Sequence, residues 1–445
     1  MITRIRNYLS GTSLGPQMIK AVIGSAGLRI AGMGFGLLVG VQLARGLGVE
    51  GYGVYGLAMS TIALLTVPTE FGLPQLVTRE VAAARVTSNW SLLRGVLRWA
   101  SRTSLLISLV VALSVLAWLV FSGQGFATTL GLTLVVGLIM VPIVAQGKIC
   151  CAALRGLEKI VQGQFPETVL RPALFSFLLF IAPLLFVPLN PAFSMGLGAL
   201  SASLVFFVSY MMLRKEMPVV ACPSEAFSDA RKWWPSAFPM ALTEGMRVLQ
   251  AHLVILFIGM LGTLSMVGVY RVASSVALLV AVPVTLFNVV SAPVISRLYT
   301  EDDRHRLQQL LAWVAMGMTV GTLCLVIPFI LAGDILLGTV FGHEFAKGRT
   351  ALLILCVGVV INSFFGANAT LLNMTGFQGR VTRASSLSLI LLVIVSPLLI
   401  LGAGIEGAAV GSSLALGLWN YLMWRDALRL LSLNSCAGAY FNLRR

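Results

Sequence analysis

Two matching stretches decide the fold of this chain: Gly53–Pro68, GVYGLAMSTIALLTVP, and Gly268–Pro283, GVYRVASSVALLVAVP. At an offset of 215 positions they share eight identical residues within sixteen. Each stretch lies in the second apolar segment of its half of the chain. The match indicates two copies of one helical unit, related by duplication.

Apolar segments recur twelve times, each close to the ~20 residues that a helix needs to cross hydrocarbon. They are expected at residues 18–42, 52–76, 98–121, 127–151, 167–187, 191–213, 236–261, 267–293, 309–331, 349–373, 382–403 and 406–427. Only 11% of the residues are charged, against roughly 25% in a soluble domain. The sequence therefore predicts an all-α integral membrane protein with twelve transmembrane helices, the first of which is retained.

The positive charges lie mostly on one side of these segments. Counting along the connections places 25 of the 31 Lys and Arg residues on the side that holds both termini. By the positive-inside rule both termini are expected in the cytoplasm, as in a multi-pass protein of the cytoplasmic (inner) membrane. The topology accounts for the net charge of +15, so no nucleic-acid partner is expected.

The longest polar stretch, residues 215–235, is expected to be a cytoplasmic linker. It separates an N-lobe, residues 1–214 with the first six segments, from a C-lobe, residues 236–445 with the last six. An even number of segments in each lobe gives both lobes the same orientation, related by an axis along the membrane normal. Within the repeat, Gly53 and Gly268 are expected to let the chain turn, and Tyr55 and Tyr270 to anchor at the outer membrane surface.

Charged residues inside the segments are the best markers of function, because a charge at the centre of a helix costs about 2.5 to 3.5 kcal/mol on insertion scales. Arg29 lies roughly 17 Å into the first segment and is expected to face the interior. In the seventh segment Glu244 and Arg247 are close enough to pair, with His252 nearby, and Arg271 lies in the eighth. Because one carboxylate cannot neutralise three arginines, the interior is expected to be positive and to bind an anion.

Other charges lie at the inner ends of segments. Arg98, Arg102 and Arg171 are candidates for guiding an anionic head group, although ordinary interface anchoring also explains them. Glu70 is interpreted as a solvated helix terminus. The first six segments are therefore expected to hold no deep acidic group.

Nothing in the sequence points to an enzyme. Paired catalytic carboxylates, a phosphate-binding loop with Lys and Ser/Thr, and a GxSxG elbow are all missing from the sequence. The six cysteines form no CxxC or Cys/His cluster. No cofactor and no metal site are expected.

The motif Leu43–Tyr55, LARGLGVEGYGVY, followed by Glu70–Leu73, EFGL, and Thr78–Glu80, TRE, resembles the polysaccharide-export flippases. These are the Wzx-type O-antigen and exopolysaccharide transporters of the multidrug/oligosaccharidyl-lipid/polysaccharide (MOP) superfamily. The resemblance implies a MATE-like fold of two six-helix lobes around a central cavity. It also implies that a polyprenyl-pyrophosphate-linked oligosaccharide moves across the membrane by alternating access.

This resemblance makes the lipid-linked glycan the expected substrate, with membrane lipids, a polysaccharide polymerase and a chain-length regulator as partners. Arg29, Arg247 and Arg271 are suitable pyrophosphate ligands. Glu244, and after it His252, are the candidates for coupling transport to an ion. Proton or sodium coupling, the membrane potential and downhill flow driven by polymerisation are all open as energy sources.

Three alternatives share parts of this pattern. A cation-coupled drug exporter of the same superfamily is disfavoured because it is expected to carry acidic residues in the N-lobe. A flippase for the peptidoglycan precursor is close in chemistry but is expected to have extra helices. A non-transport scaffold of polysaccharide assembly would not require arginines at the midplane.

Overall fold

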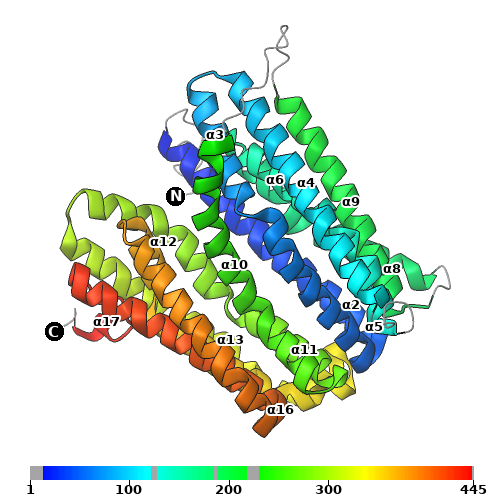
Figure 1. Cartoon of the computed structure of the whole chain (residues 1–445). Coiled ribbons are helices and arrows are strands. Elements are labelled where there is room, and N and C mark those ends of the chain that lie inside the picture. The colour runs from blue at the N-terminus through cyan, green and yellow to red at the C-terminus, as the bar shows by residue number, and fades with distance from the viewer. Residues whose placement is uncertain (1–13, 122–127, 185–187, 218–229, 443–445) are drawn as a thin grey trace. The chain divides into compact units, whose positions relative to one another are not determined.

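The computed structural model describes residues 14–121, 128–184, 188–217 and 230–442. All the secondary structure in those ranges is helical, and no β-strand occurs in them (Figure 1). The expected linker 215–235 lies largely outside them, as do the tails that carry Arg4, Arg6, Arg444 and Arg445. Ten helices of the described residues are long and apolar enough to cross a membrane. Two of these, α2 (Leu14–Glu70) and α16 (Gln378–Leu431), each contain two expected segments joined across a kink. Within the described residues, all twelve expected segments therefore correspond to helical structure, and residues 127 and 185–187 of two segments lie outside this description.

The chain divides into two compact units. Unit 1 comprises residues 1–46 and 58–248, and unit 2 comprises residues 47–57 and 249–445. The expected boundary near residue 215 differs from this division, because α10 (Ala230–Leu261) continues in unit 1 as far as Val248. Residues 47–57 of α2 belong to unit 2.

Unit 1 is a bundle in which α6 packs against α3, α4 and α9. Besides its parts of α2 and α10, it contains α3 (Leu73–Val86), α4 (Trp90–Phe121), α5 (Thr129–Leu138), α6 (Met140–Gly156), α7 (Ile160–Phe165), the π-helical turn η1 (Pro166–Leu170), α8 (Arg171–Leu184) and α9 (Pro191–Glu216). Side chains cap three of these helices: Thr128 accepts from the Gly131 N–H at 3.0 Å, Asn190 from the Phe193 N–H at 2.8 Å, and Asn89 from the Leu92 N–H at 3.1 Å. Such caps satisfy backbone donors that begin a helix without a partner.

Unit 2 is built around α14 (Arg349–Phe365), which packs against α11 (Leu264–Val280), α13 (Arg304–Phe341) and α16. The unit also contains α12 (Val282–Thr300), η2 (His343–Gly348), α15 (Asn368–Met374) and α17 (Ala439–Asn442). Thr263 and Asp303 cap α11 and α13. In α16 the kink falls at Gly404, whose φ of 57° is in the left-handed region that glycine adopts without strain.

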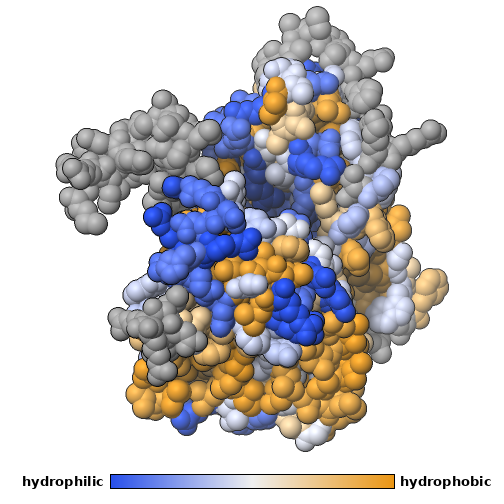
Figure 2. All heavy atoms as spheres, turned by 90° about the vertical axis from the view of Figure 1, so that its left-hand side faces the viewer, coloured by the Kyte–Doolittle hydropathy of each residue, from blue (hydrophilic) through white to orange (hydrophobic). Residues whose placement is uncertain are grey.

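Hydrophobic residues gather over the lower part of the face shown in Figure 2, with hydrophilic residues above them. On α4, large apolar side chains form a face of Leu105, Leu106, Leu109, Val110 and Leu113, each 52 to 64% exposed. A soluble protein rarely exposes so continuous an apolar surface. Hydrocarbon is the solvent that suits it, in agreement with the expected membrane class.

The repeated glycines of the sequence make a helix crossing inside unit 2. A Cβ on Gly53 would lie 1.8 Å from the Leu264 carbonyl oxygen, and one on Gly268 would lie 2.2 Å from that of Val49. The expectation that these glycines turn the chain is wrong, because the turn is at Gly48, with a φ of 67°. Their function is to let two helical backbones touch.

The repeated tyrosines are buried rather than anchored at the membrane surface. Tyr55 is 3% exposed and Tyr270 is 4% exposed. The Tyr270 hydroxyl lies 2.8 Å from that of Ser412. The duplicated motif is therefore part of the core of unit 2.

Candidate functional site

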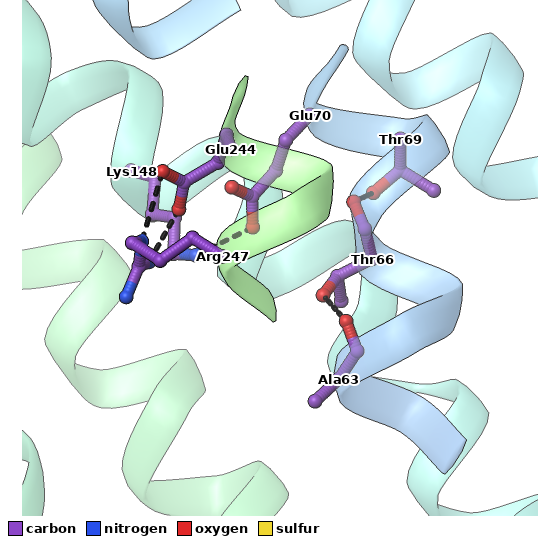
Figure 3. A network of polar contacts seen from close by, with 7 residues as sticks. All are labelled: Ala63, Thr66, Thr69, Glu70, Lys148, Glu244 and Arg247. Atoms are coloured by element: carbon purple, nitrogen blue, oxygen red, sulfur yellow. Dashed lines mark hydrogen bonds and ion pairs between the residues drawn. The ribbon is translucent and has the colours of Figure 1, made fainter. Parts of the chain in front are cut away.

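Four charged side chains meet inside unit 1, and we call them the charge cluster: Glu70, Lys148, Glu244 and Arg247 (Figure 3). The Lys148 ammonium donates to Glu70 Oε1 at 2.6 Å. Arg247 Nε donates to Glu244 Oε2 at 3.0 Å, and its Nη2 donates to Glu244 Oε1. The two pairs also interact across the cluster, Lys148 with Glu244 and Glu70 with Arg247.

The local sequence positions Glu70 at an abrupt helix end. The Thr69 hydroxyl donates a hydrogen bond to the Thr66 carbonyl at 2.8 Å inside α2, and the helix ends at Glu70. Gly72 follows with a φ of 68°, and a Cβ there would lie 2.6 Å from both the Ala237 oxygen and the Ala241 nitrogen of α10. Because only glycine fits under α10 at this point, the turn is fixed and the carboxylate is held beside Lys148.

Glu70 corrects an expectation from the sequence. It is 6% exposed and ion-paired, so it is not a solvated terminus. The first six segments therefore hold a buried acidic group, at the end of α2. The expectation missed it because the lysine that neutralises it is 78 positions away in the chain.

The cluster presents its cations outward and keeps its carboxylates behind them. The Arg247 side chain is 68% exposed and that of Lys148 is 29% exposed, against 21% for Glu244 and 7% for Glu70. Carboxylates in this position orient a guanidinium without covering its outer face. A cation that is oriented from behind is well prepared to bind an anion.

Arg247 lies at the middle of its helix. It follows the start of α10 by seventeen residues and precedes the end by fourteen. An exposed arginine at this depth is too costly against lipid, so it must face water or a ligand.

Glu167 adds a third carboxylate to the surroundings of the cluster. It lies in η1 and interacts electrostatically with Lys148, Arg171 and Arg155. A π-helical turn inside a membrane helix is often found at functional positions. Arg171, one of the expected guides for a head group, is half-buried and directly follows this turn.

Arg29 lies on α2, fifteen residues after its start and nineteen before the kink at Gly48. Its side chain is exposed and is not packed within the core of unit 1. Gly27, Gly34 and Gly36 on the same stretch have open space around them. Glu244 pairs with Arg247 and not with Arg29, which makes no ion pair with any described residue.

The remaining expected residues lie apart from the cluster. Arg98 and Arg102 are exposed on α4 and form no ion pair within the described part of the chain. His252 belongs to unit 2, is half-buried and interacts with its surroundings.

Arg271 holds unit 2 together. It donates to the Gly56 carbonyl at 3.0 Å, and its guanidinium lies 5.7 Å from the ring centres of both Tyr52 and Tyr55. These contacts join α11 to residues 47–57. They explain the arginine structurally by a hydrogen bond and two cation–π contacts.

Unit 2 contains a cavity of about 440 Å³. Polar lining residues include Gln250, Tyr270, Asn362, Ser412 and Trp419, and none of the lining residues is charged. The described residues also contain no group of three His, Cys, Asp or Glu side chains that could hold a metal. The sequence did not single out this cavity, since its residues come from α10, α11, α14 and α16.

Comparison with known proteins supports a transport fold. A family model described as polysaccharide biosynthesis protein matches residues 19–299. A probable low-salt glycan biosynthesis flippase of Haloferax volcanii is 29% identical over 162 residues, which cover 36% of this chain. The match spans about a third of that relative, 34% of its length.

Solved structures share the fold over most of their length. An inward-facing multidrug resistance MATE family transporter of the MOP superfamily has a TM-score of 0.71 at 15% identity, covering 92% of this chain and 98% of the other. The lipid II flippase MurJ, in an inward closed conformation, has a TM-score of 0.69 at 14% identity, covering 92% and 87%. A MOP superfamily transporter from Pyrococcus furiosus has a TM-score of 0.67 at 15% identity, covering 95% of this chain and 99% of the other. The named relatives are transporters and flippases, not enzymes.

Proposed function

We propose that this protein, which belongs to the polysaccharide biosynthesis protein family, is a flippase for a polyprenyl-pyrophosphate-linked oligosaccharide. One observation carries the proposal: Arg247 is exposed at the middle of α10 and is oriented from behind by Glu244. A pyrophosphate has the charge and the acceptor oxygens that such a guanidinium binds through charge-assisted hydrogen bonds.

Arg29 supports the same assignment as a second exposed cation near the middle of a long apolar helix. Together with the outward ammonium of Lys148, it suits an anionic group better than a cationic drug. The buried acids Glu70 and Glu167 do not reverse this preference, because Lys148, Arg171 and Arg155 offset their charge. Arg98, Arg102 and Arg271 stay weaker candidates as substrate ligands.

Glu244 is the proposed coupling group, with His252 as the second candidate. While Glu244 is ionised, two of its oxygens hold the Arg247 guanidinium. Protonation of Glu244 weakens that pair and releases the guanidinium from its fixed orientation, so proton binding and substrate binding are linked. Glu244→Gln is expected to abolish any dependence of transport on pH.

The test is transport of a fluorescent polyprenyl-pyrophosphate disaccharide across vesicles that contain the purified full chain. Arg247→Ala and Arg29→Ala are each expected to slow transport by about 10- to 100-fold, the range that corresponds to losing one hydrogen bond from a charged group. The control is Arg79→Ala, which removes an exposed arginine that pairs with its sequence neighbour Glu80. Normal transport in both test variants, at equal protein content, would refute the proposal.

A further inference from the structure

The cavity of unit 2 differs in chemistry from the charge cluster of unit 1. Its volume of about 440 Å³ is within the range of roughly 300 to 1,000 Å³ that is common for small-molecule sites. Its lining is mostly apolar, with amides and hydroxyls interspersed and no carboxylate, ammonium or guanidinium among the lining residues. An ion there would find no counter-charge among the lining residues, which favours a neutral occupant.

The hydrogen bonds of the lining show which atoms remain free for an occupant. Ser412 donates its proton to the Ala408 carbonyl at 2.9 Å, so Tyr270 must donate to the Ser412 oxygen. Ser413 donates to the Ile354 carbonyl at 2.9 Å, and the Gln250 amide nitrogen donates to the Ser385 carbonyl at 3.0 Å. The free atoms of these residues are therefore mainly oxygen acceptors.

Asn362 and Trp419 complete the lining. The Asn362 side chain makes no hydrogen bond with another described residue, so its amide has both donor and acceptor capacity left. Trp419 donates its indole N–H to Ser385 Oγ at 3.0 Å, which holds a half-buried aromatic ring at the cavity. A neutral molecule with several hydroxyl donors and an apolar C–H face matches this combination of acceptors and ring surface.

We propose that this cavity binds a neutral sugar residue of the transported glycan, separately from the pyrophosphate. The proposal rests on the proposed flippase function and adds where the carbohydrate is recognised. Unit 1 provides the charges and unit 2 provides an uncharged site rich in acceptors.

The experiment compares two probes on the purified full chain in nanodiscs: polyprenyl pyrophosphate alone, and the same lipid carrying N-acetylglucosamine-galactose. Wild type is expected to bind the sugar-bearing probe more tightly. Asn362→Leu is expected to reduce that preference by about five-fold, the equivalent of one net hydrogen bond. Binding of the bare lipid pyrophosphate should stay unchanged. The matched control is Asn373→Leu, since Asn373 of α15 is half-buried but does not line the cavity.

Each other outcome overturns a different statement. An unchanged preference in Asn362→Leu and in Gln250→Leu would refute the sugar site while leaving the flippase function intact. Binding of tetraphenylphosphonium that Asn362→Leu removes would show a site for cations and also refute it. Failure of wild type to bind either probe would refute the flippase function and the sugar site together. If Asn362→Leu does not fold, Gln250→Leu provides the same comparison.

Discussion

Removing Lys148 should destabilise unit 1 by stranding the carboxylate of Glu70. The Lys148 ammonium is 2.6 Å from Glu70 Oε1, and the glutamate side chain is only 7% exposed. In Lys148→Met the neighbouring methylenes keep much of their packing while the counter-charge disappears. The remaining carboxylate must then stay buried without its direct ion pair, with only the electrostatic attraction of Arg247, or take up a proton.

The magnitude follows from the exposure of the two partners. Breaking a buried ion pair from one side costs about 3 to 5 kcal/mol. Lys148 is 29% exposed, so water reaches the site and the lower end, about 3 kcal/mol, applies. Removing both charges in Glu70→Gln/Lys148→Met strands neither member of the pair. Glu167 then loses the attraction of Lys148 together with the repulsion of Glu70, so the loss should be within about 1 kcal/mol of wild type.

The assay is unfolding of the full chain in mixed micelles of dodecyl maltoside and SDS. Trp99, Trp233 and Trp234 report on unit 1 through fluorescence, because Trp99 lies 5.1 Å and 5.6 Å from the two other rings. Circular dichroism serves as the second probe, since coincident transitions are needed before a free energy is assigned. Glu80→Gln is the control, because it breaks the exposed pair with Arg79 and should cost about 0 to 1 kcal/mol.

Two results would refute this reasoning. The first is a loss below about 1 kcal/mol in Lys148→Met, which would show that the buried carboxylate is well solvated. The second is a double variant that is less stable than Lys148→Met, which would show that packing and not charge dominates at this position.

The crossing glycines and one buried thiol allow further tests. Gly53→Ala or Gly268→Ala should destabilise unit 2 by about 3 kcal/mol, the upper end for overpacking, because the new Cβ would overlap a carbonyl oxygen. The control Gly27→Ala should be neutral or slightly stabilising, because the space around Gly27 is open. Equal effects of these variants in the same unfolding assay would contradict the helix crossing. Burial raises the pKa of the Cys436 thiol, which follows the end of α16. At pH 8.5, where an ordinary thiol is about half ionised, Cys436 should therefore stay mostly protonated and react with iodoacetamide several-fold more slowly than a cysteine peptide. Site-resolved mass spectrometry measures the rate, and equal rates in the native protein would disprove the effect.

The sequence alone determined the membrane class, the all-helical fold and the approximate limits of the twelve segments. These features depend on the length and hydropathy of each segment, which can be read from the sequence without knowing which segments pack together in the fold. The pairing of Glu244 with Arg247 was also predictable from the sequence, because residues three positions apart on one helix are neighbours on its surface. The repeated glycines Gly53 and Gly268 were also recognisable in the sequence, but the close contact between two helices that they permit was not.

Only the tertiary structure decided which distant groups meet. Glu70 is buried against Lys148 because the turn at Gly72 is held beneath α10, and no local pattern encodes that contact. Arg271 donates a hydrogen bond to Gly56 and makes cation–π contacts with two tyrosines. The uncharged cavity is lined by residues of four helices. Hydropathy predicts that a helix crosses the membrane, but the rotation and packing of each helix against its neighbours decide whether a charge is buried, paired or left open to a ligand.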